Sequence, residues 1–202
     1  VRNVGENEYL WLGGDHYGDW LAMDNPGSME GKTDKDFIAS CFFANSVKLF
    51  IKSGKALEKD MTEYEGLYKN IVENIRQYFP IGKKSALDTQ TVYVLLIAFD
   101  IAEDYERAGQ CLVKLIKDNG MKLTTGFVGT PYLLHALSKT NNIDVAYKLL
   151  FSEQCPSWLY SVNHGATTIW EHWDSIKEDG SFWPANMNSF NHYAYGSVFD
   201  WI

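Results

Sequence analysis

Apolar residues recur at helical spacing along most of the chain, in two alternating patterns. In the first, residues 34–53 and 88–102 are apolar on a wide face or nearly all round. In the second, residues 57–79 and 105–119 carry one apolar stripe and a charged face opposite it. Helices of the first kind are buried on most sides, and those of the second kind lie half-exposed at a surface. The pattern therefore predicts buried helices that alternate with half-exposed ones.

Capping residues predict where several of these helices begin and end. Thr33 is expected to be the N-cap of the first helix and Gly54 its end, because hydroxyl side chains favour N-caps and glycine favours C-terminal ends. Pro80 should end the second helix, and Pro131 should open the fifth at its first turn. The expected helices are residues 34–53, 57–79, 88–102, 105–119, 131–139 and 143–152, and a last one begins near residue 191.

The helices form pairs, each a buried helix followed by an amphipathic one, that recur at roughly 40–55 residues, as in arrays of helical hairpins. No strand pattern is convincing. Such an array, with buried helices inside and half-exposed ones outside, closes into an α/α toroid. We therefore predict an all-α fold with the loops before the inner helices on one face. Those loops are residues 15–19, 80–87, 122–130 and 155–189.

Acidic residues and tryptophans concentrate in the first and last of these loops. Aromatic residues make up 15% of the chain, with seven Trp and twelve Tyr, which favours a ligand site lined by rings. In the last loop Glu171 lies between two tryptophans, Trp170 and Trp173, and beside a histidine. A carboxylate that moves a proton and rings that hold a pyranose suit the cleavage of a sugar. The alternative is a partly buried glutamate in an aromatic-rich loop.

The first loop holds Asp15, Asp19 and Trp20 among glycines, which suits a polar ligand. Aspartate and glycine are also what turns are made of, so a purely structural role is the alternative. A second assignment of the chemistry has Asp15 or Asp19 as base and Glu171 as acid. His192 suits a hydrogen bond to a sugar hydroxyl, and the alternative is a core histidine that caps the last helix.

Charge and composition argue against several partners. The net charge is −8 and no basic patch is present, whereas nucleic-acid binding needs clustered Lys and Arg. No apolar run reaches the roughly 18 residues of a membrane span. The three cysteines lack zinc-ligand spacing and the histidines form no metal-binding pair, so we predict neither a metal nor another cofactor.

The ends of the chain favour a piece of a larger domain. A length of 202 residues suits one domain or part of one, and 46% hydrophobic residues suffice for a packed core. Val1 stands where an initiator Met is expected, and the last residues stop in mid-pattern. We expect residues 1–202 to be a fragment of a single domain, truncated at both ends.

Five short segments follow one another along the chain: residues 17–21 (YGDWL), 89–91 (TQT), 129–133 (GTPYL), 165–174 (GATTIWEHWD) and 191–198 (NHYAYGSV). In this order they resemble the catalytic domain of the bacterial α-L-rhamnosidases of glycoside hydrolase family 78. The resemblance spans essentially the whole chain, and the blocks around Glu171 and His192 are its most specific parts. It implies an (α/α)6 barrel, of which this chain holds too few helices to close the ring, and inversion at the anomeric carbon.

For the site, the resemblance implies a general base and a rhamnose subsite. Glu171 matches the family's general base, and His192 with Trp20 and Trp173 would line the subsite. The family's general acid lies in an acidic motif with Arg and Gly-Trp, upstream of all these segments, and the sequence contains no such motif. The acid was therefore either removed or lies upstream of the chain.

The implied function is an inverting hydrolase that releases terminal α-L-rhamnose from rhamnose-containing oligosaccharides or glycosides. A second interpretation is a carbohydrate-binding toroid without catalysis, which an upstream acidic motif would argue against. A third is another α/α-toroid enzyme, such as a glucuronyl hydrolase or a trehalase-like glucosidase. Activity on a panel of nitrophenyl glycosides separates the third from the first.

Overall fold

The computed structural model describes residues 7–79, 81 and 88–202, and within them the regular elements are helices. The α-helices are α1 (Lys35–Ala56), α2 (Thr62–Tyr78), α3 (Gln90–Ala98), α4 (Tyr105–Asp118), α5 (Thr130–Lys139), α6 (Ile143–Leu150) and α7 (Trp158–Asn163). Two 3-10 helices follow, η1 (Ala185–Met187) and η2 (Ala194–Asp200). The β-structure of these residues consists of two isolated bridges, Trp20 with Glu30 and Ile176 with Phe182. The predicted all-α fold class is confirmed.

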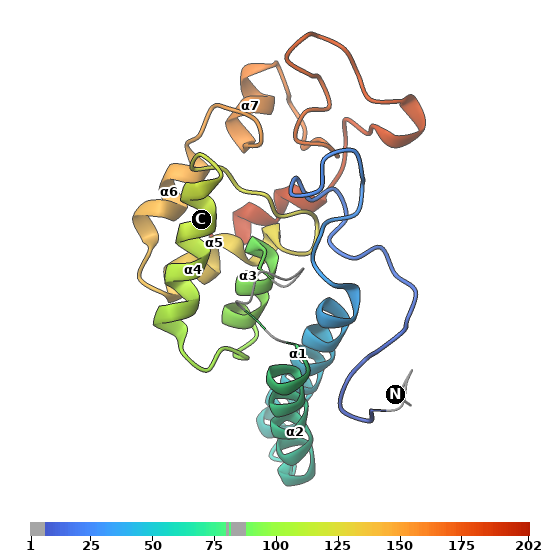
Figure 1. Ribbon diagram of the computed structural model, residues 1–202, viewed down its shortest axis with the longest axis vertical. Helices are drawn as coiled ribbons and strands as arrows, with labels where there is room; N and C mark the ends of the chain where they lie inside the picture. The colour runs from blue at the N-terminus through green and yellow to red at the C-terminus, as the bar shows by residue number, and fades with distance from the viewer. Residues whose placement is uncertain (1–6, 80, 82–87) are drawn as a thin grey trace.

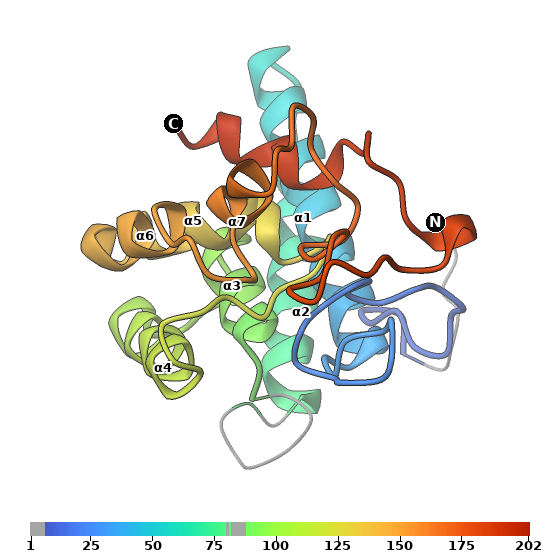
Figure 2. The same ribbon diagram turned by 90° about the horizontal axis from the view of Figure 1, so that it is seen from above.

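Burial follows the apolar pattern in α2 and α3, whereas α1, predicted to be buried on most sides, buries one face and leaves Leu49 and Phe50 exposed. In α3 every residue from Gln90 to Ile97 is buried, because this helix packs against α1, α4 and α5. In α2 only a stripe of Ile71, Val72 and Ile75 is buried. Figure 2 shows α3 near the centre of the molecule and α4 and α6 at its periphery. The inner helices therefore form the core, and each outer helix covers it with one face.

The loops that lead into the inner helices gather at one end of the molecule (Figure 1). The later part of the segment before α1, the loop before α5 and the long segment between α6 and η2 lie there. The first two are joined by backbone hydrogen bonds of 2.9 Å, from Met23 to Thr124 and from Phe127 to Trp20. The predicted contribution of residues 80–87, including the helix end at Pro80, lies outside the described residues except for Ile81.

The first helix is capped differently from the prediction. Asp34, and not Thr33, is the N-cap of α1, and its side chain accepts a backbone N–H of the first turn at 2.8 Å. The hydroxyl of Thr33 is instead 2.6 Å from that of Thr89, so it links the start of α1 to the start of α3. Gly54 does not end the helix, which continues to Ala56.

Residues with a positive φ shorten the next two helices. α2 begins at Thr62, later than predicted, because Glu58 has φ 56° and Asp60 accepts the backbone N–H of Thr62 at 3.0 Å. α3 ends at Ala98, earlier than predicted, because Asp100 has φ 63° and turns the chain. Sequence periodicity carries no signal for such isolated left-handed residues outside glycine.

Two expectations for the C-terminal third were wrong. The predicted loop 155–189 contains α7, whose N-cap Ser157 accepts the backbone N–H of Tyr160 at 3.1 Å. The last helix is a 3-10 helix that begins at Ala194 rather than near Asn191. It begins late because residues 189–192 hydrogen-bond to the segment around Glu171.

The carboxylate of Asp100 joins three neighbouring helices at the C-terminal end of α3. Lys48 of α1 and Lys139 of α5 form ion pairs with its two oxygens. Tyr105 of α4 donates its hydroxyl hydrogen bond at 2.7 Å. Burial alone would raise the pKa of Asp100, but the hydrogen bonds from the two lysines and the tyrosine outweigh it and lower the pKa to about 2. The ionised carboxylate is therefore the form that these helices hold.

Replacing this carboxylate should weaken the fold in a pH-dependent way. We expect Asp100→Asn to lower the free energy of unfolding by about 1 kcal/mol at neutral pH, a modest loss because exposed ion pairs are screened by solvent. Because the folded pKa lies below the ordinary value of 3.8, the contribution is present above about pH 4 and is lost as the pH falls toward 2. Urea unfolding at neutral pH and near pH 3 measures both effects.

A matched control is Asp118→Asn, which removes an exposed ion pair with Lys114 within α4. It should lower the free energy of unfolding by no more than about 0.5 kcal/mol. An equal loss for Asp100→Asn at both pH values would contradict the role given to its charge.

Candidate functional site

Glu171 lies in an irregular segment that is hydrogen-bonded to residues 189–192. Its backbone N–H donates to the carbonyl of Ser189 at 2.9 Å, and the N–H of Ser189 donates to Glu171 Oε2 at 2.8 Å. Further along, the N–H of His192 donates to the carbonyl of Ile169 at 2.8 Å. No hydrogen bond reaches Oε1 of Glu171 from the described residues, and the side chain is half-buried. One carboxylate oxygen is thus held in place, and the other is free to accept a proton.

His192 lies on the same pair of segments, and its tautomer follows from its contacts. The N–H of Ala194 donates to Nδ1 of His192 at 3.3 Å, so the neutral ring carries its proton on Nε2. The imidazole makes stacked contacts with two rings, Phe127 at 4.9 Å and Tyr193 at 5.1 Å between centroids. Nε2 is therefore a hydrogen-bond donor on a ring whose plane is defined by its neighbours.

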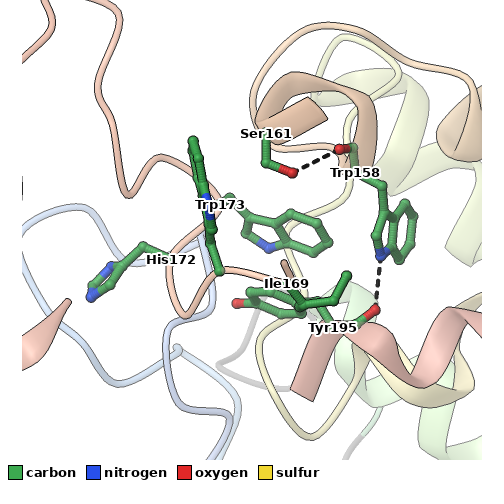
Figure 3. Close-up of a pocket in the computed structure, with 7 residues that line it drawn as sticks. Trp158, Ser161, Ile169, His172, Trp173 and Tyr195 are labelled. Atoms are coloured by element: carbon green, nitrogen blue, oxygen red, sulfur yellow. Dashed lines mark hydrogen bonds between the residues drawn. The ribbon is translucent and has the colours of Figure 1, made fainter. Parts of the chain in front are cut away.

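A stack of aromatic rings lies between α7 and η2 (Figure 3). Trp173 lies flat on Tyr195 with centroids 3.8 Å apart, and Trp158 meets Trp173 edge-on at 5.1 Å. The indole N–H of Trp158 donates to the carbonyl of Tyr195 at 2.9 Å. The cavity among these rings has a volume of about 10 Å³, which is room for one water and not for a sugar.

The two tryptophans beside Glu171 are enclosed by this packing. Trp173 is 4% exposed and Trp170 is 5% exposed, and Trp170 meets Phe190 edge-on at 5.3 Å. Additional chain around these residues could only bury them further. Neither indole exposes a ring face, so we assign both to support of the Glu171 segment rather than to direct contact with a sugar.

A second aromatic cluster holds the loop that carries Ser189. The ring of Trp183 stacks on His172 at 4.6 Å, and its indole N–H donates to Asp174 Oδ1 at 2.9 Å. The ammonium of Lys177 lies 4.4 Å from the centre of the Trp183 ring, in a cation–π contact. Burial lowers the pKa of His172, which favours the neutral imidazole in this stack.

Asp19 is the most completely enclosed carboxylate of this end of the molecule. It is 0% exposed, and four donors reach its two oxygens. The hydroxyl of Thr91 and the N–H of Gly126 donate to Oδ2. The N–H groups of Val128 and Gly129 donate to Oδ1 at 2.8 and 3.2 Å. Burial raises the pKa of Asp19, and the four hydrogen bonds oppose that rise.

The three predicted site residues of the first loop, Asp19, Trp20 and Asp15, differ in their contacts. Asp19 has no oxygen left for a ligand, so we assign it to holding the loop before α5. Trp20 is half-exposed, its ring meets Tyr17 edge-on at 5.2 Å, and it keeps a surface that a sugar could reach. Asp15 is exposed, and no hydrogen bond to its side chain is found among the described residues.

A chain of contacts links Trp20 to the Glu171 segment. The carbonyl of Trp20 accepts the backbone N–H of Phe127, and the ring of Phe127 stacks on the imidazole of His192. The backbone N–H of His192 in turn donates to the carbonyl of Ile169. The structure thus joins two motifs that are far apart in sequence. Sequence reasoning missed Phe127, because a single Phe in a glycine-rich loop gives no signal beyond its hydrophobicity.

Metal and membrane features are limited in the part of the chain that the structure describes. Within residues 7–79, 81 and 88–202, no group of three or more His, Cys, Asp or Glu side chains is arranged to hold a metal ion. In the same residues, no helix combines the length and apolarity needed to cross a bilayer.

With this geometry in view, comparison with known proteins gives a consistent result. Residues 2–202 match the family described as bacterial alpha-L-rhamnosidase 6 hairpin glycosidase domain. The chain belongs to this family. Its inner and outer helices are part of an α/α toroid, as the sequence predicts.

Named relatives and solved structures agree with the family match. An alpha-L-rhamnosidase of Formosa agariphila is 44% identical over an alignment of 193 residues, and the alignment covers 92% of this chain and 21% of the relative. The crystal structure of a Streptomyces avermitilis alpha-L-rhamnosidase complexed with L-rhamnose has a TM-score of 0.88 at 42% identity, covering 97% of this chain and 19% of that one. An alpha-L-rhamnosidase structure from Aspergillus terreus has a TM-score of 0.85 at 33% identity, covering 92% and 22%. The chain thus spans about a fifth of the length of these relatives.

The Asp19 contacts predict a large effect of a small substitution. Asp19→Asn keeps the size of the side chain but turns an NH₂ group toward backbone N–H donors, so at least one buried donor loses its acceptor. We expect the free energy of unfolding to fall by about 2–4 kcal/mol. Denaturant unfolding of the variant and the unaltered protein measures the loss.

Asp24→Asn is the control, because Asp24 is only half-buried and accepts one backbone N–H, from Lys32. It should change the free energy of unfolding by about 0.5 kcal/mol or less. If Asp19→Asn proves as mild as this control, the role of Asp19 as the centre of the loop is wrong.

Proposed function

We propose that this chain is part of the catalytic domain of an inverting α-L-rhamnosidase, with Glu171 as its general base. The observation that carries the proposal is the asymmetry of the Glu171 carboxylate. Oε2 accepts the N–H of Ser189 at 2.8 Å, whereas Oε1 is free of protein donors among the described residues. The names of the relatives and their family support the choice of rhamnosides as substrates.

In the proposed reaction Oε1 of Glu171 takes a proton from a water molecule as the water oxygen attacks the anomeric carbon. The bond from this carbon to the leaving oxygen breaks, and a general acid gives that oxygen a proton. An attack from the opposite face inverts the configuration, and the two carboxyl groups of such enzymes lie about 6.5–9.5 Å apart. The N–H of Ser189 keeps the carboxylate oriented without consuming the oxygen that reacts.

The rest of the proposed site recognises the sugar. His192 donates from Nε2 to a sugar hydroxyl, because its Nδ1 already accepts the N–H of Ala194. Trp20 offers an indole that is half-exposed, and the face of a pyranose stacks on such a ring. Asp15, which is exposed, is retained as a polar contact of the substrate at the edge of the site.

The general acid belongs to another part of the same polypeptide in this proposal. The chain spans 21% of its relative from Formosa agariphila, and no acidic motif with Arg and Gly-Trp is present in its sequence. We therefore regard residues 1–202 as one piece of a single catalytic domain. A toroid that binds carbohydrate without cleaving it is the competing function, and the assay below decides between the two.

The test replaces Glu171 by glutamine in the whole polypeptide to which these residues belong. The amide preserves size and the hydrogen bond from Ser189 but cannot accept the proton from water. We expect kcat for an aryl α-L-rhamnoside to fall about 10²–10⁴-fold, with a much smaller change in KM. NMR should show the product of the unaltered enzyme with inverted anomeric configuration.

Glu178→Gln is the matched control, since Glu178 is an exposed glutamate in the same segment. It should leave kcat and KM within about twofold of the unaltered enzyme. Near-normal kcat for Glu171→Gln, or a product of retained configuration, would exclude Glu171 as the base. Binding of L-rhamnose without any hydrolysis would favour the non-catalytic toroid.

A further inference from the structure

Phe127 connects the buried part of the molecule to His192, the histidine that is proposed to bind the sugar. Its ring lies parallel to the imidazole of His192, with centroids 4.9 Å apart and planes 20° apart. It also meets Tyr195 edge-on at 5.3 Å, so one ring contacts both the histidine and the aromatic stack behind Glu171. Phe127 itself is half-exposed and touches no charged group in these contacts.

The backbone around Phe127 is fixed by Asp19. Hydrogen bonds from Gly126, Val128 and Gly129 to the Asp19 carboxylate hold the residues before and after the phenylalanine. The N–H of Phe127 itself donates to the carbonyl of Trp20 at 2.9 Å. Close packing adds to this, because a Cβ on Gly126 would lie 2.1 Å from the carbonyl oxygen of Trp20. The ring is therefore carried by a backbone with little freedom to move.

The ring plane of His192 has to be fixed by a contact from outside the residue. The χ2 torsion of histidine has broad minima, so the ring plane is not set by the side chain alone. The hydrogen bond from Ala194 to Nδ1 is long, at 3.3 Å, and defines the orientation weakly. The second stacking ring, Tyr193, is 87% exposed and is the direct neighbour of His192 in sequence. Phe127 is the one stacking partner of His192, among the described residues, that is anchored to a distant part of the fold.

We infer that Phe127, held in place by Asp19, is a positioning residue that aims the Nε2–H of His192 at the bound sugar. The inference rests on the proposed function, since it deepens the part that His192 plays there. A flat ring against one face of the imidazole removes rotation about χ2, and a non-planar side chain of similar volume does not. Phe127 thus acts on substrate affinity through His192, without touching the reacting atoms.

The experiment compares Phe127→Leu and Phe127→Tyr in the whole polypeptide, with an aryl α-L-rhamnoside as substrate. Leucine keeps the apolar volume but loses the flat face, so KM should rise about tenfold, equivalent to about 1.4 kcal/mol, and kcat should change less than threefold. Tyrosine keeps the flat face and should hold KM within about twofold of the unaltered enzyme. Calorimetric titration with L-rhamnose should show the same order of affinities.

Phe42→Leu is the matched control for lost packing. Phe42 is half-exposed like Phe127, and its ring packs edge-on against Phe99 and Tyr132 between the inner helices. At a similar fall in melting temperature it should leave KM unchanged. An equal rise in KM for both leucine variants would reduce Phe127 to ordinary packing and overturn the inference, as would an unchanged KM for Phe127→Leu.

A structural measurement separates this inference from the proposed function. Crystal structures of the unaltered protein and of Phe127→Leu should show one orientation of His192 in the first and a rotated or multiply oriented ring in the second. If the unaltered protein neither binds L-rhamnose nor cleaves rhamnosides, the proposed function fails, and the orientation of His192 still decides the role of Phe127. An identical, single orientation in both structures would contradict that role.

Discussion

The end of the molecule where the loops before the inner helices gather depends on one buried carboxylate. Taking the charge of Asp19 out of water is unfavourable by several kcal/mol unless donors replace the water, and here Thr91 and three backbone N–H groups do so. Those donors belong to the start of α3 and to the loop before α5. A single side chain thereby fixes the N-terminal segment, an inner helix and the loop of Phe127 with respect to one another.

The opposite end of the inner helices uses a carboxylate in a different way. Asp100 is 38% exposed and is balanced by the ammonium groups of Lys48 and Lys139, whereas Asp19 is fully buried and is balanced by neutral donors. The difference follows from solvent access, since lysine side chains keep their charge hydrated at the rim and backbone N–H groups suit a dry interior. α1, α3 and α5 are therefore held by charge at one end, by apolar packing along their length, and by a buried hydrogen-bond network at the other.

The sequence predicted those features that depend on local pattern. The contrast between the buried helix α3 and the half-exposed helix α2 was predicted correctly because apolar periodicity reports which faces are covered. Glu171 was singled out because its aromatic neighbours form a distinct block. The start of α2 and the end of α3 were not predictable, because Glu58 and Asp100 adopt a positive φ that the sequence does not mark outside glycine. The contacts of Asp19 were equally hidden, since three of its donors are backbone N–H groups of the loop before α5, more than 100 positions along the chain.

Two carboxylates in predicted site motifs thus differ in how many donors they accept, and this difference supports the separate roles proposed for them. Both Asp19 and Glu171 stand next to tryptophans, in loops that lead to inner helices. Asp19 accepts four hydrogen bonds and has no lone pair directed at a ligand, so its charge serves the fold. Glu171 accepts one, from Ser189, and keeps an oxygen free. A base must be held without being saturated, because every further donor on its reactive oxygen would stabilise the charged form and weaken its pull on a proton of water. The backbone N–H of Ser189 meets the first condition, and the absence of a second donor among the described residues meets the other.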